Sequence, residues 1–120
     1  MARTPSASDF FVNVPAVGGF TFARRAMRDE VAIQVEFARL IDGAPPTEWL
    51  QVVCGWLSVL KVLTVRAPDG WNLDLLDPLD PETYAKLNAV YDKLLEQERS
   101  FRLGNAPSSE ASGAGATGDN

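Results

Sequence analysis

The sequence predicts a mainly α-helical fold: a compact three-helix domain with a small N-terminal β-hairpin and a disordered C-terminal tail. The chain has 120 residues, 46% of them hydrophobic and 22% charged, which is the balance of one folded domain. Three segments show the apolar periodicity of amphipathic helices, and two short apolar runs precede them. We therefore expect a flexible arm over 1–9, one helical domain with its hairpin over 10–103, and a tail over 104–120.

The hairpin is predicted from two β-like runs, 10–14 and 20–25, which flank the loop Pro15-Ala16-Val17-Gly18-Gly19. An isolated hairpin is only marginally stable in water, so this one has to pack against the rest of the domain. Its four phenylalanines provide the means: Phe10, Phe11, Phe20 and Phe22.

The segment 26–41 fits two patterns. Val31, Ile33, Val35 and Phe37 alternate with smaller or polar residues, as in a strand. At 100° per residue, however, the charged residues gather on one side and the apolar ones on the other. A helix is favoured by the acids Asp29 and Glu30 near its start, by Arg39 near its end and by the stop signal Asp42-Gly43. The predicted apolar side holds Met27, Val31, Ile33, Val35, Phe37, Ala38, Leu40 and Ile41.

The segment 47–65 is predicted to be the central helix of the core, with Thr47 as its N-cap after two prolines. About half of its circumference is apolar: Trp49, Leu50, Val52, Val53, Trp56, Leu57, Val59, Leu60 and Leu63. The other side is small and polar, so another element can lie close to it. The polar residues on that side also favour a half-buried helix over a membrane span.

A third helix is predicted from Asp80-Pro81-Glu82, which combines an N-cap, a proline at the first position and an acid. It runs to about residue 102, with Glu82 and Lys86 as a favourable pair one turn apart. Its apolar face holds Tyr84, Leu87, Val90, Tyr91, Leu94 and Leu95. In 104–120, 11 of the 17 residues are Gly, Ala or Ser, a composition that cannot form a core.

The composition excludes several kinds of function. The chain has no histidine and one cysteine, which excludes an intrachain disulfide and zinc sites built from Cys and His. The net charge of −5 argues against binding to nucleic acid. No apolar run that would serve as a signal peptide follows the N-terminus. Cys54 is therefore interpreted as a reduced thiol that packs between helices, since no histidine is present to activate it as a nucleophile.

Five acids lie within 14 residues: Asp69, Asp74, Asp77, Asp80 and Glu82. A metal site or a carboxylate-based hydrolase is one interpretation, but the spacing fits no EF-hand loop and no base accompanies the acids. We expect Asp77 and Asp80 to be turn and cap residues. A third interpretation is an acidic docking surface for a basic partner. We thus predict no catalytic, cofactor-binding or metal-binding residue, and no enzymatic activity.

Arg24, Arg25 and Arg28 form a small basic cluster, which we expect to pair with the acidic loop of this chain or of a neighbour. Trp49 and Trp56 are seven residues apart and so share a helix face. Trp71, in a loop, is the tryptophan that we expect to be exposed.

Several sequence blocks between residues 20 and 102 carry a resemblance to a known family. They are Phe20-Thr21-Phe22, Met27-Arg28-Asp29-Glu30, Pro46-Thr47-Glu48-Trp49-Leu50, Leu63-Thr64-Val65, Ala67-Pro68-Asp69-Gly70-Trp71-Asn72-Leu73, Asp77-Pro78-Leu79-Asp80, Tyr84 and Glu98-Arg99-Ser100-Phe101-Arg102. Over about two thirds of its length the chain resembles the small tail assembly chaperones of long-tailed phages and prophages.

The resemblance implies a non-enzymatic protein of the host bacterial cytoplasm that is absent from the mature virion. It implies binding to the tape measure protein and recruitment of tail tube subunits, without cofactor, nucleic acid or membrane. In many phages a ribosomal frameshift extends such chaperones, and the tail from Gly104 stands where that junction would lie.

The residues that we expect to contact the partner are Phe10, Phe11, Phe20, Phe22 and Trp71. The main alternative is a minor tail protein or head–tail connector that stays in the virion. A small hydrolase using the carboxylates of 69–82 and a transcriptional regulator are further alternatives, both disfavoured by composition.

Overall fold

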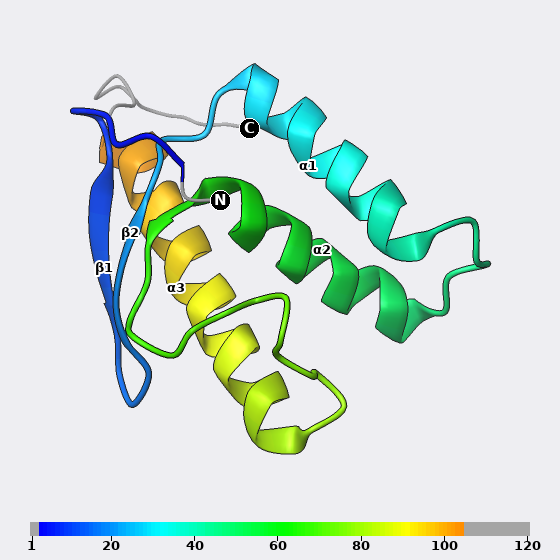
Figure 1. Cartoon of the computed structure of the whole chain (residues 1–120). Coiled ribbons are helices and arrows are strands. Elements are labelled where there is room, and N and C mark those ends of the chain that lie inside the picture. Colours follow the sequence, from blue (N-terminus) through cyan, green and yellow to red (C-terminus); the bar gives the residue numbers. More distant parts are fainter. Residues whose placement is uncertain (1–2, 105–120) are drawn as a thin grey trace.

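The computed structural model describes residues 3–104, and their fold has the predicted class (Figure 1). The elements follow the order β1 (Phe10–Val14), β2 (Gly18–Phe22), α1 (Met27–Ile41), α2 (Glu48–Leu63), β3 (Thr64–Arg66) and α3 (Pro81–Gly104). Three helices and a small antiparallel sheet make the described chain mainly helical. Apart from Gly104, the predicted tail lies outside the described residues.

The predicted hairpin is present, and a third strand extends it. Phe10 of β1 pairs with Phe22 of β2, and Val14 pairs with Gly18. The strand order is β1-β2-β3, so β2 is central. The prediction that 47–65 is one helix is wrong at its end, because α2 stops at Leu63 and Thr64 starts β3. Thr64 and Val65 are β-branched, and strand pairing with β2 supplies their backbone with partners.

The predicted helix boundaries have local causes that the structure confirms. Thr47 caps α2, since its Oγ1 accepts a hydrogen bond of 3.1 Å from the backbone N–H of Leu50. Asp80 caps α3 in the same way, accepting from the N–H of Thr83 at 3.0 Å. The first helix ends where Asp42 adopts a left-handed conformation with φ of 51° and Gly43 follows with φ of 78°.

The core lies where α2, α3 and the inner face of the sheet meet. Figure 1 shows α2 between α1 and α3, while the sheet packs beside α3 and the C-terminal end of α2. The buried cluster draws on the three helices and on β1 and β2: Val12, Val14, Phe20, Phe22, Ile33, Val53, Trp56, Val59, Leu60, Leu63, Leu87, Val90 and Leu94. The prediction that α2 is central is therefore confirmed.

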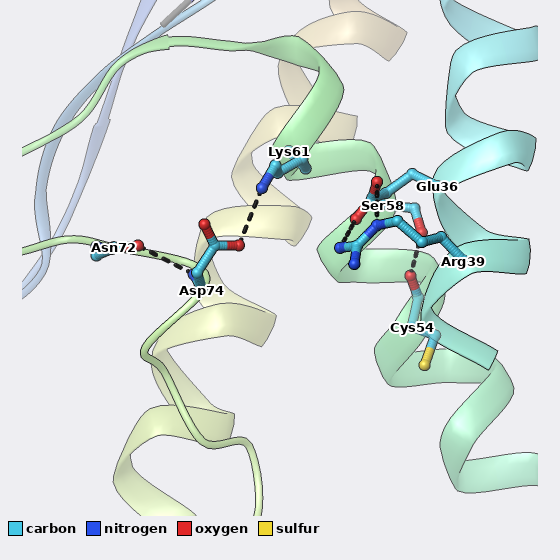
Figure 2. Close-up of polar contacts among 7 residues, drawn as sticks. All are labelled: Glu36, Arg39, Cys54, Ser58, Lys61, Asn72 and Asp74. Atoms are coloured by element: carbon cyan, nitrogen blue, oxygen red, sulfur yellow. Dashed lines mark hydrogen bonds and ion pairs between the residues drawn. The ribbon is translucent and has the colours of Figure 1, made fainter. Parts of the chain in front are cut away.

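The small side of α2 lies next to α1, as its residue types predicted. Cys54 and Ser58 are buried there, and Ser58 Oγ donates a hydrogen bond of 2.6 Å to the carbonyl oxygen of Cys54 (Figure 2). Small side chains let the two helices approach closely, and the local hydrogen bond satisfies the buried hydroxyl. Cys54 is thus a packing residue, and burial raises the pKa of its thiol.

The segment predicted to be a flexible arm is attached to the domain at Arg3. The Nη1 atom of Arg3 donates to Asp29 Oδ1 at 2.9 Å and to the carbonyl oxygen of Val62 at 3.0 Å. Asp29 is buried in the first turn of α1, so its carboxylate requires a counter-charge. Arg3 supplies that charge, and it connects the N-terminal segment to α1 and α2.

No helix within residues 3–104 combines the length and the apolar character that crossing a membrane requires.

Candidate protein-binding surfaces

The five aromatic residues predicted to contact a partner have three different environments. Phe20 and Phe22 are 0% exposed and stack on each other with ring centroids 5.7 Å apart. Phe20 also receives Trp71 edge-on at 5.1 Å. A side chain without exposed surface cannot contact another molecule in this conformation. Phe20 and Phe22 are therefore core residues, and their assignment to a binding surface is corrected.

Phe10 is half-buried and fixes the hairpin to the end of α3. Its ring lies edge-on to Phe101 at 4.9 Å and tilted to Phe22 at 6.0 Å. The guanidinium carbon of Arg24 lies 4.2 Å from the centroid of the Phe101 ring. This arrangement is a cation–π and aromatic cluster that holds β1 on α3. Packing therefore occupies most of the surface of Phe10.

Phe11 is the exposed member of the predicted set, with 67% of its surface accessible. Its ring covers Gly19 on the neighbouring strand, because a Cβ added to Gly19 would lie 2.6 Å from it. Because glycine has no side chain, one face of the ring packs on the backbone at that position and the other face points outward. Among the phenylalanines of the hairpin, Phe11 is therefore the one available to a partner.

The tryptophans differ from the prediction. Trp71 is half-buried, and its Nε1 is buried without a hydrogen-bond partner among the described residues. Trp56 is buried, whereas Trp49 is 39% exposed. Both pack on Tyr84 from the same face of α2, as their spacing predicted, with centroid distances of 5.1 and 6.4 Å. The expectation that Trp71 is the exposed tryptophan is therefore wrong, because Phe20 receives its ring.

Four exposed apolar side chains belong to α2 and to the loop before α3. Leu75 and Leu79, in the loop before this helix, are 81% and 75% exposed. Trp49 stacks on Tyr84 in the first turn of α3, and Val52, one turn later in α2, is also exposed. We call Trp49, Val52, Leu75 and Leu79 the apolar patch. Sequence reasoning missed its two leucines because they stand in a loop without helical periodicity.

The acids beside the apolar patch have structural partners, as predicted for Asp77 and Asp80. Asp77 Oδ1 accepts from the N–H of Leu79 at 2.9 Å in a turn, and Asp80 is the cap of α3. Asp74 pairs with Lys61 at 2.9 Å. Within residues 3–104, no three Cys, Asp or Glu side chains come close enough to hold a metal ion. The loop is thus an acidic edge around apolar side chains.

Charged residues of α1, α2 and this loop meet in a hollow of about 420 Å³ (Figure 2). Arg39 Nε donates to Glu36 Oε1 at 3.0 Å, and Lys61 Nζ donates to Asp74 Oδ1 at 2.9 Å. The bond from Arg39 lowers the pKa of Glu36, and the bond from Lys61 lowers the pKa of Asp74. Because these charges are paired with one another, the residues around the hollow serve to connect α1, α2 and the loop.

The basic cluster pairs differently from the prediction. Arg25 holds Glu98 of α3 through two hydrogen bonds of 3.0 and 3.1 Å, and it also reaches Glu30 at 3.2 Å. Glu98 is 8% exposed, so it needs this bidentate partner. Burial alone would lower the pKa of Arg25, but its bonds to Glu98 and Glu30 outweigh that effect and raise it. The expected pairing with the acidic loop of this chain is therefore corrected for Arg25, which pairs with Glu98 of α3 and Glu30 of α1.

The first helix has a second apolar side that no described element covers. Met27, Val31 and Val35 are 77%, 59% and 65% exposed, and they follow one another at intervals of four residues. We call these three residues the outer stripe. Ile33 is buried on the opposite side, facing α2. The prediction that all apolar residues of α1 share one side is therefore wrong.

A comparison of the chain with protein-family models, curated proteins and solved structures finds no match.

Proposed function

We propose that this protein is a non-enzymatic phage tail assembly chaperone that binds the tape measure protein and helps to recruit tail tube subunits. It would act in the cytoplasm of the infected bacterium and be absent from the finished particle. The observation that carries the proposal is the apolar patch: four large apolar side chains of α2 and of the loop before α3 are exposed. Exposed apolar surface of this kind is typical of protein-binding sites.

The chemistry of the apolar patch favours one kind of partner. Asp69, Asp77 and Glu82 are exposed in or beside the same loop, giving the patch an acidic edge. An amphipathic helix with apolar residues on one side and Lys or Arg along the flanks is complementary to both features. A tape measure protein, being a long helical chain, offers such segments. Phe11 lies on a separate element at the edge of the sheet, where it would contact a second protein such as a tail tube subunit.

The absence of catalysis is part of the proposal, and the roles of the carboxylates support it. Asp74 is held by Lys61, and Asp77 and Asp80 bind backbone N–H groups. Carboxylates engaged in this way maintain the loop conformation. We therefore assign the loop to recognition of a partner.

The test is co-purification of the full chain with the tape measure protein encoded in the same gene cluster. Changing Leu75 and Leu79 together to serine should reduce binding at least tenfold, because two leucines buried in an interface contribute about 3–6 kcal/mol. Val31→Ser is the control, since it removes from α1 an apolar side chain that is also more than half exposed. Circular dichroism and urea unfolding check that both variants fold.

Unchanged binding by the folded Leu75/Leu79 variant would contradict the proposal. Mass spectrometry of purified virions provides a second test, since a chaperone should be missing from them. Stoichiometric amounts of this protein in the particles would instead favour a minor tail protein or a head–tail connector.

A further inference from the structure

Two hollows adjoin at the end of the molecule where the sheet, the start of α1 and the end of α3 meet (Figure 1). The first hollow, of about 320 Å³, is lined by the link between β2 and α1 and by the last turns of α3. The second, of about 310 Å³, is lined by the same link, the N-terminal segment and the first turn of α1. Arg24, in the link, lines both, so a molecule that occupies both hollows contacts Arg24 from each of them.

The four acidic side chains that line these hollows already bind groups of this chain. Two arginines hold three of the carboxylates, and a backbone N–H donates to Oδ2 of the fourth. The pairs are Arg3 with Asp29 at 2.9 Å, Arg25 with Glu98 at 3.0 Å, Arg25 with Glu30 at 3.2 Å, and the N–H of Ser6 with Asp9 at 2.8 Å.

Three further arginines around the hollows have no carboxylate partner. Arg102 lines the first hollow, Arg28 the second and Arg24 both, and all three are exposed. None of them forms an ion pair within residues 3–104. The contact of Arg24 with the Phe101 ring restricts its side chain before any partner binds, which lowers the entropy cost of binding. The guanidinium groups that remain available here are positive, although the whole chain has a net charge of −5.

An acidic protein segment matches this arrangement. A guanidinium binds a carboxylate through two parallel hydrogen bonds, and each hollow offers Arg24 together with one other unpaired arginine. Leu95 and Phe101 also line the first hollow, where they offer apolar surface to the methylene groups of a glutamate. A segment with two carboxylates occupies both hollows, and it gains affinity because binding of the first raises the effective concentration of the second.

Nucleic acid and a second copy of this chain are poorer matches. Nucleic acid carries a phosphate at every nucleotide, whereas three unpaired arginines release few counterions and the net charge repels a polyanion. A second copy would have to offer the acidic loop before α3. Its Asp74 already binds Lys61, and Asp77 and Asp80 already bind backbone N–H groups.

We propose that Arg24, Arg28 and Arg102 form a docking site for an acidic segment of a partner protein, with one Asp or Glu carboxylate in each hollow and Arg24 between them. The apolar patch lies on α2 and on the loop before α3, so this site is a separate surface. The protein therefore has one surface for an apolar helix with basic flanks and another for an acidic segment.

The first experiment measures binding of labelled synthetic peptides to the full chain by fluorescence anisotropy. The probe is a glycine–serine peptide with two glutamates, made with several lengths of spacer between them, and its control carries two glutamines instead. The glutamate peptide should bind about tenfold more tightly or better, and its affinity should fall as the salt concentration rises. A peptide with one glutamate should bind roughly tenfold more weakly, because it fills one hollow.

The second experiment compares variants of the three arginines. Arg24→Gln should weaken binding of the two-glutamate peptide about tenfold or more, because Arg24 serves both hollows. Arg28→Gln and Arg102→Gln should each weaken it roughly threefold to tenfold, because each serves one hollow. Lys86→Gln is the matched control, since it removes the same charge near the other end of α3, and it should bind like the wild type.

Circular dichroism checks the fold of each variant. Arg24→Gln also loses the contact with Phe101, whereas Arg28 and Arg102 form no ion pair within residues 3–104. The latter two variants therefore test the site even if Arg24→Gln disturbs the hairpin.

Equal binding of the glutamate and glutamine peptides, or unchanged binding by folded Arg28→Gln and Arg102→Gln, would overturn the proposal. Tighter binding of a short DNA duplex than of the acidic peptide would overturn it in favour of nucleic acid. Self-association in sedimentation that Arg24→Gln abolishes would overturn it in favour of a second copy. The test is independent of the proposed function, since the Leu75/Leu79 variant should bind the acidic peptide as the wild type does.

Discussion

The two neighbouring helices α1 and α2 are nearly equal in length, with 15 and 16 residues, but they differ in what they bury. The second helix buries seven residues: Val53, Cys54, Trp56, Ser58, Val59, Leu60 and Leu63. The first buries two, Asp29 and Ile33. Figure 1 shows the cause, since α2 lies between α1 and α3 whereas α1 has a neighbour on one side. Position in the fold, more than apolar content, decides how much of a helix is covered.

The difference also explains why the sequence of α1 resembles a strand. Val31, Ile33, Val35 and Phe37 alternate with other residues, and two residues of a helix span 200°. Alternation within a helix therefore places apolar side chains on opposite sides. Val31 and Val35 point outward, while Ile33 is buried and Phe37 is half-buried. The apparent ambiguity is the pattern of a helix with two apolar sides.

The largest expected effect comes from making the same change in both helices. Leu60 of α2 is 0% exposed, so Leu60→Ala should lower the free energy of unfolding by about 3–5 kcal/mol through lost burial and a cavity. Leu40 of α1 is half-buried, so Leu40→Ala should cost only about 1 kcal/mol. Urea unfolding of both variants measures the contrast. Equal losses would show that α1 is as well embedded as α2.

An intermediate effect is expected from the one buried charge of α1. Burial alone would raise the pKa of Asp29, but hydrogen bonds from Arg3 and from the N–H of Ala26 outweigh burial and lower it. Asp29→Asn should therefore destabilise the protein at neutral pH by about 1–2 kcal/mol, through loss of the charge-assisted bond. Asp92→Asn, on an exposed position of α3, is the matched control and should change stability by less than about 0.5 kcal/mol.

The pH dependence of that effect has a defined sign. Because the pKa of Asp29 is lower in the folded state than its ordinary value of 3.8, its stabilisation is fully present above 3.8. The stabilisation disappears as the pH falls through the lower folded value, where the carboxylate takes up a proton. The difference between wild type and Asp29→Asn should accordingly shrink on acidification. A difference that grows in acid would contradict the assignment of Asp29 as an ionised partner of Arg3.

Most of the fold could be predicted from the sequence because its signals are local. Thr47 and Asp80 cap their helices, and Asp42-Gly43 ends α1, each through contacts within a few residues. The third strand was missed because Thr64 and Val65 continue the apolar pattern of α2, and only pairing with distant β2 makes them a strand. The attachment of Arg3 to Asp29 spans 26 residues and likewise leaves no local signal.

The binding surfaces were less predictable, because exposure depends on which neighbours arrive. Phe20 and Phe22 have the same residue type as Phe11, but the sheet turns them inward and turns Phe11 outward. Leu75 and Leu79 lie among acids and other leucines in a loop, and this pattern does not reveal which of the side chains face water. The phenylalanines therefore predicted correctly that the hairpin packs on the rest of the domain. Of the four, only Phe11 is exposed for contact with a partner.

The smallest expected effect lies on the outer stripe and tests whether α1 has one covered side or two. Val31 is 59% exposed, and alanine is the better helix former, so Val31→Ala should leave the free energy of unfolding within about 0.5 kcal/mol of wild type. Urea unfolding of the two proteins measures the difference. A loss of more than about 1 kcal/mol would mean that a neighbour other than α2 covers this side of α1.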